Sequence, residues 1–121
     1  MSSIDECLRS YGVPWPGNLD GFVYDRTLDK VSVIFELSQT RKFPVETHDL
    51  NRFFNKDVNR WKALDILKKQ LNVQLCILIW SNHEDIVKIH KGAEITDKAL
   101  NFERTEIIKS GQIVQYFGQF K

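Results

Sequence analysis

Apolar residues occur along this chain in short blocks, and the spacing within each block predicts an element. The segments LDGFVYD (19–25) and VSVIFELSQ (31–39) are rich in β-branched and aromatic residues. They flank the polar turn RTLDK (26–30), so we expect a β-hairpin here. The run VQLCILIW (73–80) is apolar almost throughout, which predicts a fully buried strand in a central or parallel position.

Two further segments have helical periodicity. Ser3 and Glu6 have the spacing of a capping box and predict a short helix over 4–11. Thr47 is a candidate N-cap for a long helix over 48–71. The apolar residues of that helix recur at steps of three and four: Leu50, Phe53, Phe54, Val58, Trp61, Leu64 and Leu71.

The last third of the chain has the composition of additional strands. EDIVKIH (84–90) fits one strand, and FERTEIIK (102–109) and QIVQYFGQF (112–120) flank Ser110-Gly111, which predicts a tight hairpin turn. The expected order is helix, strand, strand, helix, strand and further strands. We therefore predict an α/β fold with a single mixed sheet flanked by helices, in one domain spanning 1–121.

Composition narrows the classes of function without selecting one. The 121 residues suit one domain, and a net charge of +1 gives no global preference for nucleic acid or membrane. The longest apolar run is too short to span a bilayer, and the N-terminus lacks the pattern of a signal peptide. Cys7 and Cys76 lack the spacing of a zinc site, which fits a reducing, cytoplasmic location.

A carboxylate, Glu36, interrupts the apolar strand at 31–39. If the hairpin turn is centred on Leu28, paired residue numbers sum to 56, and Asp20 faces Glu36 about 5 Å away. Two facing carboxylates repel unless a cation lies between them or one of them is protonated. The alternative is that Glu36 marks the solvated end of a strand, because a slip of one residue would put the two on opposite faces.

The order of elements and the motif around this pair resemble those of the PD-(D/E)XK nuclease superfamily. Asp20 is followed by fifteen residues and then by Glu36-Leu37-Ser38. In that family an Asp opens one strand and a Glu-x-Lys tripeptide ends the next. The resemblance covers roughly residues 3–80 and implies a restriction-endonuclease-like αβββαβ core, here with a C-terminal β-hairpin extension. It also implies that Asp20 and Glu36 hold Mg²⁺ or Mn²⁺ for hydrolysis of DNA or RNA phosphodiester bonds.

Ser38 occupies the position of the family's lysine, which is thought to orient the attacking water and stabilise developing charge. Lys42 lies about 13 Å further along at the rise of a strand, so it can replace that lysine only if the strand ends and bends. A basic residue of the following helix is the other substitute. The expected catalytic set is therefore Asp20, Glu36, Ser38 and Lys42.

Basic residues at four-residue intervals on the predicted long helix form a candidate nucleic-acid surface. His48, Arg52, Lys56 and Arg60 have this spacing, and Arg41 and Lys42 precede them. Such a positive edge can track phosphates and release their counterions. The alternative is an ordinary solvated helix face with interleaved acidic residues.

Three functions remain open at this point. The first is a small Mg²⁺-dependent nuclease, active as a homodimer or as a subunit of a larger complex because 121 residues leave little room for a specificity element. The second is a catalytically inactive module of the same fold that binds nucleic acid or a protein partner. The third is an unrelated α/β domain, such as an immunity or assembly protein, in which the acidic pair arose by chance.

Overall fold

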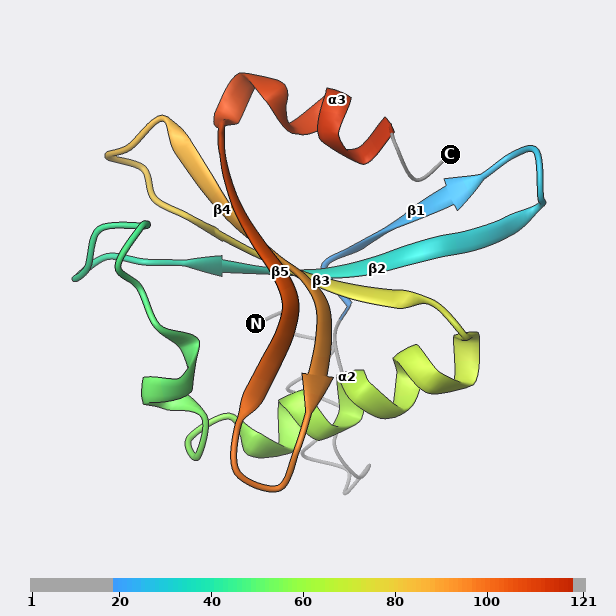
Figure 1. Ribbon diagram of the computed structural model, residues 1–121, viewed down its shortest axis with the longest axis horizontal. Helices are drawn as coiled ribbons and strands as arrows, with labels where there is room; N and C mark the ends of the chain where they lie inside the picture. The colour runs from blue at the N-terminus through green and yellow to red at the C-terminus, as the bar shows by residue number, and fades with distance from the viewer. Residues whose placement is uncertain (1–18, 119–121) are drawn as a thin grey trace, which may run out of the picture.

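Five strands form one mixed sheet in which spatial order follows chain order (Figure 1). The computed structural model describes residues 19–118, so the expected helix at 4–11 lies outside the described residues. The strands are β1 (Gly21–Asp25), β2 (Lys30–Gln39), β3 (Gln74–Trp80), β4 (Ile86–Ile95) and β5 (Leu100–Lys109). All neighbours pair antiparallel except β2 and β3, which are parallel.

The parallel pair requires a long crossover, which contains a 3-10 helix, η1 (Leu50–Phe53), and an α-helix, α2 (Val58–Leu71). The single helix expected over 48–71 is therefore wrong in its first half. The side chain of Asp49 accepts a hydrogen bond from the Asn51 backbone. The Asn51 side chain bonds both backbone groups of Leu100, at 3.1 Å and 2.8 Å. The Asp49 bond caps the short η1 and the Asn51 bonds tie it to the start of β5, and α2 begins separately after Asp57.

Each face of the sheet carries its own apolar core, and a helix lies on each face in Figure 1. Ile34 and Ile77 point toward α2, where Trp61 and Leu64 meet them. The alternate residues of the same strands, including Cys76, point toward α3 (Ile113–Gly118). Strand β3 is thus buried on both faces, as its sequence predicted.

The expected hairpin at Ser110-Gly111 is wrong. Ser110–Gln112 is a 3-10 turn, η2, which leads into α3. The Gln112 side chain accepts a hydrogen bond from the Lys109 N–H at 3.3 Å, which favours a helical turn over a return strand. The C-terminal hairpin instead joins β4 to β5. In its turn the Ala99 backbone N–H donates a hydrogen bond to the Thr96 hydroxyl.

The coarse class is confirmed as α/β with one mixed sheet flanked by helices. Within residues 19–118 only two strands precede α2, so the restriction-endonuclease-like core remains a prediction. No helix in this described range is both long and apolar enough to cross a membrane.

His90 is a titratable group buried in β4 on the side of α2. Its Nδ1 lies 2.8 Å from the Thr105 hydroxyl, and its ring stacks on Phe102 with centroids 3.9 Å apart. Burial, reinforced by the charge of Lys88, lowers the pKa of His90 to about 4. The folded protein therefore keeps this imidazole neutral at a pH where an unfolded chain protonates it.

We expect the free energy of unfolding to fall as the pH drops from 6.5 to about 4. Over this range His90 binds a proton in the unfolded state but stays neutral in the folded state. The full effect is about 3 kcal/mol, and it is absent above the unfolded pKa. Urea unfolding at pH 7 and pH 4.5 measures it. His90→Gln has no titrating ring and should flatten the dependence, and an equally steep dependence in that variant would contradict this account.

Candidate functional site

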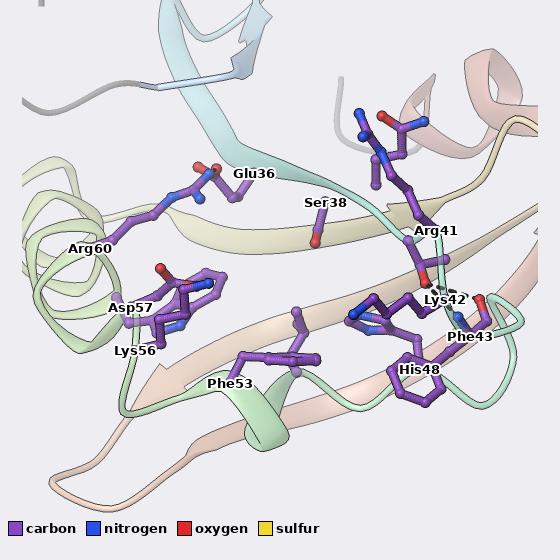
Figure 2. A pocket seen from close by; sticks show the side chains of 14 residues that line it. Glu36, Ser38, Arg41, Lys42, Phe43, His48, Phe53, Lys56, Asp57 and Arg60 are labelled. Carbon is purple, nitrogen blue, oxygen red and sulfur yellow. Dashed lines mark hydrogen bonds and ion pairs between the residues drawn. The ribbon is translucent and has the colours of Figure 1, made fainter. Parts of the chain in front are cut away.

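A cavity of about 300 Å³ opens where β2 ends and α2 begins (Figure 2). The carboxyl end of a parallel strand beside a helix N-terminus is a common ligand site in α/β proteins. Seven of the nine candidate site residues line this cavity: Glu36, Ser38, Arg41, Lys42, His48, Lys56 and Arg60. Asp20 and Arg52 are the two that do not. The structure thus brings together most of the residues selected from the sequence.

Continued by one residue beyond Gly21, the hairpin register sets Asp20 opposite Glu36, and a bulge rather than the turn position gives this register. Phe22 pairs with Ile34 and Gly21 with Phe35, so the residue numbers sum to 56 in this part of the hairpin. Beyond a bulge after Val23 the register shifts by one residue, away from the acidic pair. The Asp20 carboxylate also accepts a hydrogen bond from the Leu37 N–H at 2.8 Å, which fixes it beside β2.

The cation between the two carboxylates is Arg60, from the first turn of α2. Its Nη2 forms a close ion pair with Glu36 Oε1 and lies 3.8 Å from Asp20 Oδ2. Glu36 is only 1% exposed, whereas the Arg60 side chain is 42% exposed. A carboxylate buried to this degree needs a compensating charge, and Arg60 supplies it. Figure 2 shows the Arg60 side chain extending from α2 to the Glu36 carboxylate on β2.

The basic residues do not form one stripe along one helix, which corrects the expectation from their spacing. Arg52 belongs to η1, Arg60 to α2, and Lys56 to the turn between them. His48 precedes both elements and is buried rather than exposed. Because the helix is broken here, a four-residue interval no longer places side chains on one face.

Lys42 reaches the cavity because β2 ends at Gln39 and the chain then bends. The Thr40 hydroxyl closes this bend by donating to the Phe43 carbonyl at 2.9 Å. This is the condition under which Lys42 could approach the acidic pair despite its distance along the strand. Ser38 lies between Glu36 and Arg41 on the cavity wall in Figure 2.

Asp57 is the N-cap residue of α2, although its side chain makes no capping hydrogen bond. It lines the cavity beside Lys56 and does not point into the core. Phe43 and Phe53 also line the cavity and were not selected from the sequence. The sequence signal for Phe53 was misleading, since it fitted the apolar stripe of a helix that does not form there.

The residues present can accommodate a small, hard cation. Both oxygens of Glu36 are buried, and the Arg60 guanidinium on Oε1 is the interaction that compensates their charge in the described range. Asp20 reaches the same Arg60 nitrogen, so one cation can contact both carboxylates. No group of three or more His, Cys, Asp or Glu side chains within 19–118 is arranged to hold a metal. Mg²⁺ needs only one or two carboxylates, because water and phosphate complete its coordination.

Comparisons of the chain with protein-family models, curated proteins and solved structures gave no match. The site is therefore interpreted from its own geometry and chemistry.

We expect Arg60→Ala to lower the free energy of unfolding at pH 7 by about 3–5 kcal/mol, because it leaves the Glu36 carboxylate buried without a counter-charge. Adding Glu36→Gln to this variant should recover part of the loss, since the uncompensated charge is then removed. Urea denaturation measures both effects. Lys62→Ala, an exposed change on the same helix, is the control and should cost less than about 0.5 kcal/mol. An Arg60→Ala result in that range would mean that the pair is not structurally important.

Proposed function

We propose that this protein is a nuclease that hydrolyses phosphodiester bonds of nucleic acid with Mg²⁺ or Mn²⁺ held by Asp20 and Glu36. The observation that carries the proposal is the contact of both carboxylates with one guanidinium nitrogen of Arg60. In this proposal the two carboxylates, which share one cation of the protein, take a metal ion in its place.

The charges around the cavity support a phosphate ligand. Arg41, Lys42 and Lys56 are exposed basic residues that line it, and the buried Glu36 lines it as well. In this proposal the basic side chains bind the phosphate oxygens and orient the scissile bond toward the carboxylates. The bound metal would supply Lewis-acid stabilisation of the phosphate and an acidified water.

Arg60 has a defined part in this scheme. Its guanidinium neutralises Glu36 in the free protein, and a metal ion held by Asp20 and Glu36 would take over that neutralisation. Its side chain is 42% exposed and lies on the cavity wall, so it can turn toward an incoming phosphate without unpacking the core. Arg is well suited to that role because its planar donors match phosphate oxygens in pairs.

Ser38 lacks the charge of the lysine that the family resemblance implies, so another residue has to take its place. Lys42 and Lys56 both line the cavity, from the loop after β2 and from the turn before α2. We assign the stabilisation of developing charge to Lys42, because β2 ends at Gln39 and Lys42 lines the cavity.

The alternative is a binding module of similar architecture without hydrolysis. Two observations favour it, namely the charge compensation of Glu36 by Arg60 and the presence of Ser38 near the acidic pair. In that case Arg60 stays on the carboxylates permanently, and the basic rim binds nucleic acid or an acidic protein segment.

A cleavage assay on plasmid and single-stranded DNA with Mg²⁺, Mn²⁺ or EDTA tests the proposal. We expect metal-dependent cleavage that falls more than about 100-fold in Glu36→Gln and in Asp20→Asn, because the metal contributes several kcal/mol to the barrier reduction. Asp97→Asn, in the exposed turn between β4 and β5, should cleave like the parent protein.

Two results would contradict hydrolysis at this site. Cleavage that persists in both carboxylate variants would place the reaction elsewhere or in a contaminant. DNA binding without cleavage under any metal condition would favour the binding module instead.

A further inference from the structure

One end of the cavity is aromatic, and neither metal binding nor phosphate binding uses it. Phe43, from the loop after β2, and Phe53, from η1, lie on either side of His48. The His48 ring stacks with Phe53 at 5.9 Å between centroids and meets Phe43 edge-on at 6.3 Å. Figure 2 shows the His48 and Phe53 rings across the cavity from the Glu36–Arg60 pair.

The core does not require Phe53. Its neighbour Phe54 is 2% exposed and packs beneath α2, whereas Phe53 is 41% exposed and lines the cavity. An exposed aromatic ring in a cavity with a basic rim offers a flat apolar surface among cations. Arg52 extends the cationic surroundings, with its Cζ 4.8 Å from the centre of the Phe43 ring.

His48 adds an unsatisfied polar atom to this aromatic group. The residue is 7% exposed and lines the cavity, and its Nδ1 has no hydrogen-bond partner in the described range. Its backbone carbonyl accepts a hydrogen bond from Lys88 Nζ at 3.0 Å, which fixes the backbone at His48. A buried ring nitrogen without a partner costs free energy that a polar ligand can recover. Burial lowers the pKa of His48, with a contribution from Lys88, which favours the neutral ring.

We propose that Phe43, His48 and Phe53 form a subsite for one unpaired nucleobase, so that the substrate is single-stranded nucleic acid. This inference rests on the proposed function, because it places the base beside the phosphate that Arg41, Lys42 and Lys56 would bind. Stacking on Phe53 engages the face of the base, and His48 Nδ1 hydrogen-bonds its edge. A base in a duplex has its faces stacked and its edge paired, so it cannot enter the cavity without being flipped out.

The size of the cavity agrees with a single base. Its volume of about 300 Å³ is at the lower end of ligand pockets, which suits one base with its neighbouring nucleotides outside. The basic rim is then positioned to hold the backbone on the way to Asp20 and Glu36.

The test compares binding of a short labelled single strand with binding of the same sequence as a duplex, in EDTA so that nothing is cleaved. We expect tighter binding of the single strand by the full chain. Phe53→Ala should weaken single-strand binding roughly 5- to 150-fold and leave duplex binding unchanged. Phe53→Trp keeps a stacking surface and should retain the affinity. Phe22→Ala removes a 57% exposed ring of β1, outside the cavity lining, and is the matched control.

A 2-aminopurine base within the single strand provides a second measurement. Its fluorescence should be quenched on binding to the parent protein and to Phe53→Trp, and should stay high with Phe53→Ala, because the quenching reports stacking itself.

The outcomes separate this inference from the proposed function. Equal affinity for single strand and duplex, or no effect of Phe53→Ala, overturns the nucleobase subsite even if the protein cleaves DNA. Single-strand preference that depends on Phe53, without metal-dependent cleavage, supports the subsite and contradicts the nuclease. Binding of neither form, with capture of an acidic protein instead, overturns both.

Discussion

The ion pair between Glu36 and Arg60 is the constraint on which the rest of this site depends. Glu36 lies in a strand face otherwise occupied by residues such as Ile34, and its carboxylate is almost fully buried. A charge in such a place requires a partner of opposite sign, and the partner comes from the first turn of α2. The pair therefore fixes the start of α2 over the end of β2. Asp20, which directly precedes β1, is the second carboxylate beside Arg60.

The cavity follows from this attachment. Since α2 begins only at Val58, the chain between β2 and α2 forms a loop, a 3-10 helix and a turn around one opening. That path places cations from three segments, Arg41, Lys56 and Arg60, around a buried carboxylate, and it places aromatic rings at the other end. A continuous helix from 48 would have directed Phe53 into the core and would have left no cavity of this form. The broken helix is thus what gives the site two chemically different ends.

Local patterns were reliable where each residue's environment depends on near neighbours. Strands β1, β2 and β3 were predicted from apolar runs, whereas the register that sets Asp20 opposite Glu36 depends on a bulge after Val23 that the sequence did not indicate. Predictions failed where a distant contact decided the outcome. The first half of the long helix is lost to the bonds between Asn51 and Leu100, which are far apart in the chain. The hairpin at Ser110-Gly111 is replaced by α3, whose Ile113, Tyr116 and Phe117 pack against the sheet.

The sequence by itself determined that this protein has an α/β fold with one mixed sheet and a buried central strand. The hydrophobic period of a helix or strand is a local property, so it can be recognised in a single sequence. Only the tertiary structure decided that Arg60 is the cation between the carboxylates, that Lys42 lines the cavity, and that Phe53 lines it too rather than packing in the core. Each of these depends on how the crossover from β2 to β3 is folded. Burial of the Glu36 charge and the side-chain bonds of Asn51 fix that path, and neither appears as a pattern in the sequence.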